Sequence, residues 1–133
     1  MKPAKSKWLA YTVIVGLIPI MARLLAWVVT STGRVTPFIA SDFVAFGLVL
    51  HISVVNELEH ASIKEASMKS ILNSISLLFI TLYGALCALN VVAEHDPGLI
   101  DPTLMFFISV GFSTASMALG VVTFYYLPRI RER

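Results

Sequence analysis

Residues 41–60 read SDFVAFGLVLHISVVNELEH, and this stretch decides the fold. It is apolar enough to cross a lipid bilayer, yet it carries Asp42 near one end, His51 inside and Asn56 near the other end. Titratable groups are costly in hydrocarbon, so they face a bundle interior, pair with one another or serve a function. The stretch therefore indicates a membrane helix that presents polar side chains to other helices.

The whole chain has the composition of a membrane protein. Of its 133 residues, 57% are hydrophobic and 14% are charged, against about 25% charged in a typical soluble domain. The mean hydropathy is +0.83. A soluble domain of this size could not bury so much apolar surface in one core. The net charge of +2 is too small to indicate direct nucleic-acid binding.

Four stretches are long and apolar enough to span the bilayer, which takes about 20 helical residues. Within a single domain covering 1–133, the spans are residues 8–30, 38–56, 70–93 and 103–127. The connecting loops are 31–37 and 94–102 on one side and 57–69 on the other. Because segment 57–69 begins with helix formers, we expect the second helix to continue for a turn or two. The sequence predicts an all-α membrane protein, a small bundle of four transmembrane helices.

Lysine and arginine are distributed unevenly between the two sides of this bundle. One side would hold Lys2, Lys5, Lys7, Lys64, Lys69, Arg129, Arg131 and Arg133. The other side would hold only Arg34. Cytoplasmic loops of membrane proteins carry an excess of these residues. We therefore predict that both termini are cytoplasmic.

Arg23 and Asp42 come to a similar depth if the first two spans form an antiparallel hairpin. An unpaired charge near the bilayer centre costs at least about 2.5–3.5 kcal/mol on insertion scales. We expect an intramembrane ion pair, with a structural role favoured over a transport site. In the alternative interpretation, Arg23 snorkels outward and Asp42 caps the second helix.

His51, Asn56 and Glu57 are candidates for a pore or a switch. An imidazole titrating near neutrality can sense pH or pass protons, although a membrane histidine often hydrogen-bonds a neighbouring helix. Asn56 and Glu57 would lie at the cytoplasmic mouth of the second span. There they form either a ring of polar groups around an oligomer axis or a solvated helix extension.

Small and polar residues form stripes along the third and fourth spans. In the fourth, Ser109, Ser113, Ser116 and Gly120 are spaced by 4, 3 and 4 residues. In the third, the stripe consists of Asn73, Ser76, Tyr83, Cys87 and Asn90. Small residues at such spacing let membrane helices approach closely. We predict helix packing along both stripes, with a pore lining as the alternative.

The predicted cytoplasmic face carries exposed charges of both signs. It comprises Glu59, His60, Lys64, Lys69, Arg129 and Arg131. These residues are candidates for binding a soluble cytoplasmic protein.

Motifs of enzymes and metal sites are absent from the sequence. It has no Gly-rich phosphate loop, nucleophile elbow, HExxH pair or cysteine cluster. The three histidines, at positions 51, 60 and 95, share no metal-ligand spacing. We predict a non-enzymatic protein without a metal or another cofactor.

The chain resembles KwaA in its size and in its four spans with both termini in the cytoplasm. It also resembles KwaA in the stretch SDFVAFGLVLHISVVNELEH, which passes from the membrane into a charged cytoplasmic extension. KwaA is the membrane subunit of the Kiwa anti-phage defence system. The resemblance implies a homo-oligomer, a tetramer in our expectation, in the bacterial inner membrane. It also implies a sensor or scaffold that holds a soluble cytoplasmic partner. An oligomeric ion channel or membrane-depolarising effector and a small toxin-immunity protein are the alternatives.

Overall fold

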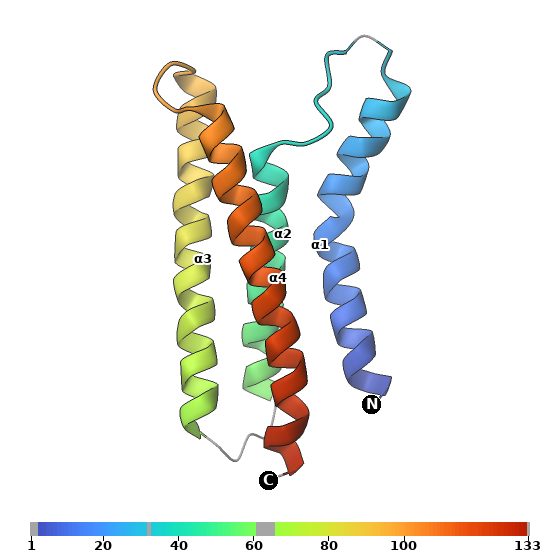
Figure 1. Cartoon of the computed structure of the whole chain (residues 1–133), viewed down its shortest axis with the longest axis vertical. Helices are drawn as coiled ribbons and strands as arrows, with labels where there is room; N and C mark the ends of the chain where they lie inside the picture. The colour runs from blue at the N-terminus through green and yellow to red at the C-terminus, as the bar shows by residue number, and fades with distance from the viewer. Residues whose placement is uncertain (1–2, 32, 61–65, 133) are drawn as a thin grey trace.

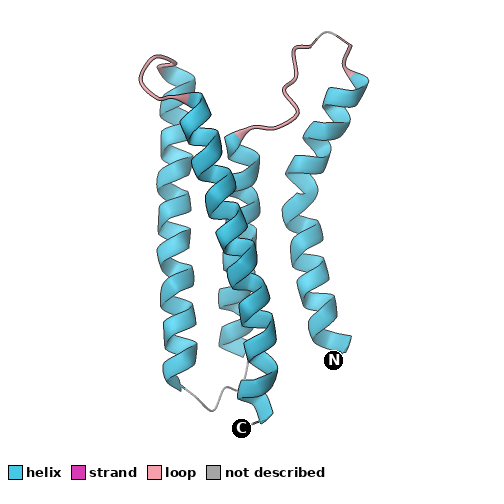
Figure 2. Ribbon diagram, viewed as in Figure 1, coloured by secondary structure: helices cyan, strands magenta, loops and turns pink. Residues whose placement is uncertain are grey.

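In the residues that the structure, a computed structural model, describes, every regular element is an α-helix. The structure describes the backbone of residues 3–31, 33–60 and 66–132, and the side chains of 7–31, 33–59, 67–123 and 125. The helices are α1 (Pro3–Val29), α2 (Ala40–His60), α3 (Ala66–His95) and α4 (Pro102–Glu132). They run up and down in turn, so that both chain termini lie at one end of the bundle (Figures 1 and 2). The predicted four-helix, all-α architecture is confirmed.

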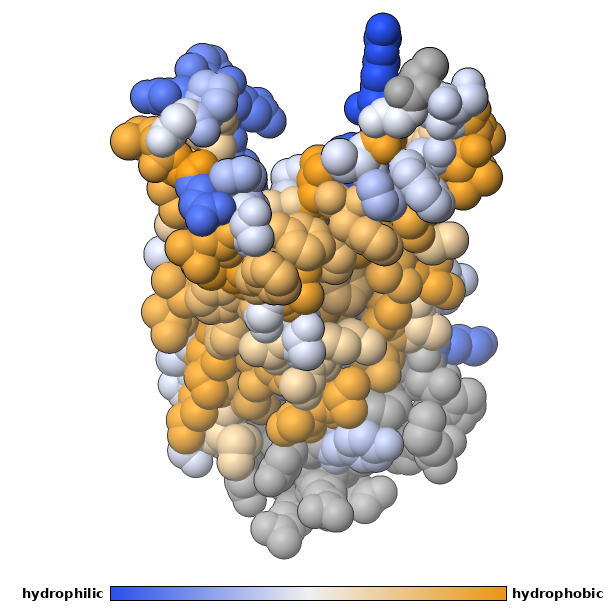
Figure 3. Space-filling model, turned by 45° about the horizontal axis from the view of Figure 1, so that its top comes forward, coloured by the Kyte–Doolittle hydropathy of each residue, from blue (hydrophilic) through white to orange (hydrophobic). Residues whose placement is uncertain are grey.

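Each helix is long and apolar enough to cross a membrane, which is the architecture of a multi-pass membrane protein. Large apolar side chains face outward along every helix, among them Ile14, Leu25, Leu78 and Phe107, each more than half exposed. Figure 3 shows a broad apolar belt over the helices, with hydrophilic residues gathered at the end of the bundle opposite the chain termini, which we call the loop end. Such a belt is unfavourable in water and suits contact with lipid chains.

The helices extend beyond the apolar stretches because backbone hydrogen bonding does not end where lipid ends. At the end of α3 the Asp96 N–H donates to the Val92 carbonyl at 2.8 Å. Asp101 caps α4, its Oδ1 accepting from the N–H groups of Thr103 and Leu104 at 2.9 and 3.3 Å. Pro102 occupies the first helical position, where its missing N–H costs nothing.

α2 is the centre of the bundle and packs against α1, α3 and α4, whereas α3 and α4 touch each other at few points. Its buried apolar residues are Val44, Phe46, Leu50, Val54 and Leu58. At 100° per residue these positions are spread over about half of the circumference of α2. Three apolar clusters result: Val44 packs with α3 and α4, Leu50 with α1, and Leu58 with the start of α3.

α1 packs mainly against α2, through a narrow face. Thr12, Gly16 and Ile20 are the buried positions of this face. A Cβ atom at Gly16 would lie 2.8 Å from Cδ2 of Phe46, so the glycine lets the two helices approach closely. An apolar cavity of about 250 Å³ lies between α1, α2 and α4, beside Leu17 and Met117.

Candidate functional site

The structure brings together Arg23 and Asp42, the two residues paired from sequence. Arg23 Nε donates to Asp42 Oδ2 at 2.5 Å, and the two side chains are 28% and 12% exposed. The contact joins α1 to α2 at the depth where both helices are flanked by apolar residues. Because each charge neutralises the other, neither has to face hydrocarbon alone.

A second polar contact joins the same two helices. The hydroxyl oxygens of Thr12 and Ser53 lie 2.7 Å apart. Sequence alone did not indicate this pair, because isolated hydroxyl residues are common in membrane helices. The two contacts lie at well-separated depths of α1 and fix its register along α2.

His51 lies in the interior, where α2, α3 and α4 meet. Its Nε2 is 2.8 Å from Ser116 Oγ of α4, and the same oxygen is 2.6 Å from the hydroxyl of Tyr83 on α3. The imidazole stacks on Phe79, with ring centroids 4.8 Å apart. One buried serine thus links a histidine and a tyrosine from two other helices.

Gly47 makes room for this network. A Cβ atom there would lie 2.1 Å from Cζ and 2.2 Å from the hydroxyl oxygen of Tyr83. The tyrosine ring therefore rests directly on the backbone of α2. Aromatic rings are among its other neighbours, and Phe112 packs against it edge-on, at 6.1 Å between centroids. Sequence did not reveal this role of Gly47, because it depends on how two helices are rotated against each other.

The serine stripe of α4 faces α2. Ser109, Ser113 and Ser116 are all buried, and Ser113 Oγ donates to the Phe43 carbonyl at 2.7 Å. Ser109 Oγ has no hydrogen-bond partner among the residues that the structure describes. Gly120 is also buried, but a Cβ atom there would contact no described atom within 4 Å. Of the described glycines, Gly47 is therefore the one against which a neighbouring side chain packs most closely.

His51, Asn56 and Glu57, the candidate pore or switch residues, are not brought together within one protomer. His51 is buried in the interior, Asn56 is exposed, and Glu57 is half-buried. On a helix, residues five and six positions apart point in different directions from the first. The structure therefore offers no single path that all three line.

The last turn of α2 and the first turn of α3, which hold the candidate partner-binding residues Glu59 and Lys69, lie at the end of the bundle that carries the chain termini (Figure 1). Glu59 is exposed near the end of α2, and Lys69 is half-buried near the start of α3. The remaining candidates, His60, Lys64, Arg129 and Arg131, lie outside the described side chains.

The His51–Ser116 contact has the geometry of a base beside a nucleophile, but it is enclosed by the bundle. Both residues are 1% exposed, and neither lines the cavities beside Met117 and Met105. Aromatic rings of Phe79, Tyr83 and Phe112 surround the pair. Among the described residues, no group of three His, Cys, Asp or Glu side chains could hold a metal ion. The arrangement is suited to joining helices.

Ser116→Ala tests this role of the network. The change removes the shared partner of His51 and Tyr83, and hydrogen bonds between membrane helices are worth about 0.6 kcal/mol on average and about 1.7 at most. We expect a loss of about 1–3 kcal/mol in the free energy of unfolding for the two bonds together. The measurement is unfolding in mixed detergent micelles containing dodecyl sulfate, followed by circular dichroism.

Ser109→Ala is the matched control, since it removes a buried hydroxyl on the same stripe that has no described partner. It should leave stability unchanged or slightly raised, because burying an unpaired polar group is itself costly. Equal losses in the two variants would show that the network contributes nothing specific.

Comparisons of the chain with protein families, with curated proteins and with solved structures found no match.

Proposed function

We propose that this chain is a non-enzymatic scaffold or sensor of the bacterial inner membrane that forms a homo-oligomer and binds a soluble cytoplasmic protein. The resemblance to KwaA suggests anti-phage defence as the setting and a homo-oligomer as the assembly, for which we expect a tetramer. One observation carries the proposal: the central histidine, His51, is bound and stacked by side chains of other helices. Side chains that hold the helices together in this way support a rigid bundle, in which the partner binds at one end.

The charge distribution supports cytoplasmic termini. Both termini lie at the same end of the bundle (Figure 1), and the helix ends there hold the basic residues Lys5, Lys7, Lys69, Arg129 and Arg131. The loops of the opposite end contain one basic residue, Arg34, and the acidic Glu94, Asp96 and Asp101. The basic end would face the cytoplasm, in keeping with the general bias of membrane proteins.

The last turns of α2 are the proposed partner surface. α2 continues as a helix through the polar residues to His60, so that Glu59 stands on a rigid element while exposed. Lys69 lies near the start of the next helix and adds a charge of the opposite sign. A mixed, rigid charged surface at the membrane boundary suits selective binding of a soluble protein.

Site-specific photocrosslinking in cells that carry the chain's native gene neighbourhood tests the proposal. A benzophenone amino acid replaces Glu59 in one variant and Leu99 in the other. Leu99 is 67% exposed and lies in the α3–α4 loop, so it is a matched position at the opposite end. We expect Glu59 to yield an adduct with one soluble protein, encoded beside this gene, and Leu99 to yield none.

The adduct should weaken when Lys69→Glu alters the same surface, whereas Arg34→Glu at the other end should leave it unchanged. Adducts of equal yield from Glu59 and Leu99, or none from Glu59, would contradict the proposed partner surface.

A further inference from the structure

A cavity of about 590 Å³ opens at the loop end of the bundle, opposite the chain termini. Its walls come from three segments distant in sequence: residues 36–41, 90–94 and 102–107. The molecular surface is hollowed between the two loops there (Figure 3). Pockets for small organic ligands are typically about 300–1,000 Å³, so this one is large enough for such a molecule.

One side of the cavity is aromatic. Phe38, Phe106 and Phe107 line it, and Phe43 stands behind them, with its ring centroid 6.2 Å from that of Phe38 and 5.6 Å from that of Phe106. The faces of such rings carry negative charge and attract weakly hydrated cations. This wall suits an apolar body and tolerates a positive charge beside it.

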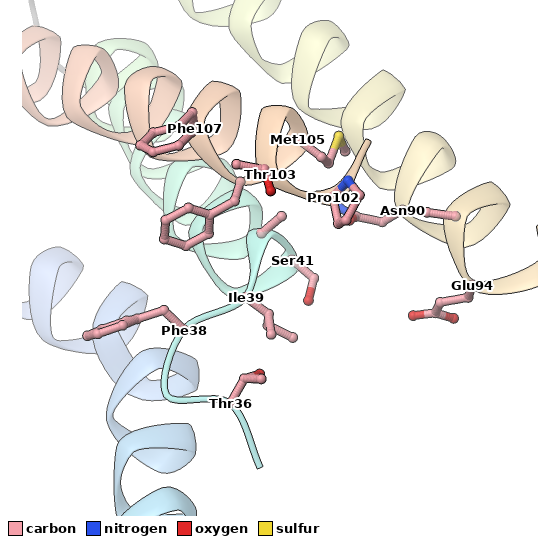
Figure 4. Close-up of a pocket in the computed structure, with 13 residues that line it drawn as sticks. Thr36, Phe38, Ile39, Ser41, Asn90, Glu94, Pro102, Thr103, Met105 and Phe107 are labelled. Atoms are coloured by element: carbon pink, nitrogen blue, oxygen red, sulfur yellow. The ribbon is translucent and has the colours of Figure 1, made fainter. Parts of the chain in front are cut away.

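The other side is polar and carries one charge. Glu94 is the charged residue of the lining, with Asn90, Ser41 and Thr36 as uncharged polar neighbours. Figure 4 shows the Glu94 carboxylate directed from α3 toward the side on which Ser41 and Thr36 lie. Glu94 makes no ion pair or hydrogen bond with another residue that the structure describes. Its charge is therefore available to a ligand.

We propose that this cavity binds a small organic cation, an ammonium group attached to an aryl or alkyl body. The ammonium would lie beside Glu94 and the apolar body against Phe106 and Phe107. An anion would meet the carboxylate unfavourably, and a bare metal ion would find a single carboxylate where it needs several oxygen ligands. The site lies at the opposite end from the proposed partner surface and is independent of it.

Binding of benzyltrimethylammonium to the full-length protein in dodecyl maltoside tests the proposal by calorimetry. Benzyl alcohol and benzoate, which keep the ring and change the charge, are the comparison ligands. We expect the cation to bind and the other two to bind at least about tenfold more weakly, a difference of about 1.4 kcal/mol. Equal binding of all three ligands would overturn the proposal.

Two variants with one matched control locate the site. Glu94→Gln should weaken cation binding about tenfold, whereas Asp96→Asn, the same charge change on a carboxylate outside the lining, should not alter it. Ala93→Phe places a ring in the cavity and should abolish binding while Glu94 remains. Circular dichroism establishes that each variant is folded. Unchanged binding to Glu94→Gln or to folded Ala93→Phe would refute the site.

A lipid amine is the competing occupant. Phosphatidylethanolamine added to the micelles presents an ammonium on a diacyl body. If it displaces the free cation at stoichiometric amounts, the cavity is a lipid site and the proposal of a free organic cation is wrong. If cation binding persists, the proposal stands.

Discussion

Gly47→Ala should destabilise the bundle by about 3 kcal/mol, at the upper end of what overpacking costs in a protein interior. The added methyl would overlap the Tyr83 ring, 2.1 Å from its Cζ. The ring cannot easily swing away, because Tyr83 is fully buried and its hydroxyl is bound to Ser116. Either α2 and α3 separate or the hydrogen bond breaks. Unfolding in dodecyl sulfate mixed micelles measures the loss.

Gly84→Ala is the control for this prediction. Gly84 lies one position from Tyr83 in α3, but a Cβ atom there meets nothing within 4 Å. The free energy of unfolding of this variant should therefore stay within about 0.5 kcal/mol of that of the parent protein. In the Tyr83→Ala background, Gly47→Ala should cost little, since the overlapping ring is gone. A full loss that persists without Tyr83 would show that the glycine serves another purpose.

Breaking the Arg23–Asp42 ion pair should cost about as much. Asp42→Arg or Arg23→Asp alone places two like charges together within the apolar part of the helices, and each single variant should lose about 2.5–3.5 kcal/mol, the cost of one uncompensated charge in a membrane helix. The swapped double variant should recover at least half of that loss, because the attraction is restored with the partners exchanged.

Asp96→Arg, a charge reversal in the exposed α3–α4 loop, should leave the free energy of unfolding nearly unchanged. A swapped variant no more stable than the two single variants would mean that Arg23 and Asp42 do not stabilise the fold through their mutual attraction.

The sequence was sufficient to predict the helical architecture, because hydropathy identifies each apolar segment independently of the others. It was less informative about helix ends. α3 carries on through Glu94 and His95, beyond the span expected to end at residue 93. Hydropathy marks where lipid contact ends, whereas the helix continues as long as its backbone is hydrogen-bonded. α1 and α4 continue even past Pro19 and Pro128.

Pairing of individual side chains followed from sequence in one case and not in others. Arg23 and Asp42 are the oppositely charged residues within the first two spans, so an ion pair within a hairpin of these spans has to join these two. Ser109, Ser113 and Ser116 are chemically alike, and which of them meets His51 depends on the depth and rotation of α4 against α2. The contact joins residues 65 positions apart, and local pattern does not determine it.

The cavity near Glu94 had no signal in the sequence for the same reason. Its three lining segments become neighbours only after α2, α3 and α4 have packed. A carboxylate near the end of an apolar stretch reads from sequence as the beginning of a loop.

The scaffold function is tested most directly by ion flux. The full-length protein is reconstituted in potassium-loaded liposomes, its helical content is verified by circular dichroism, and potassium efflux is recorded with a selective electrode. Gramicidin added at the end releases the remaining ion. A scaffold whose central histidine is bound between helices should leave efflux at the level of protein-free liposomes. Efflux above that level that disappears in His51→Ala or Glu57→Ala would contradict the scaffold and establish a channel.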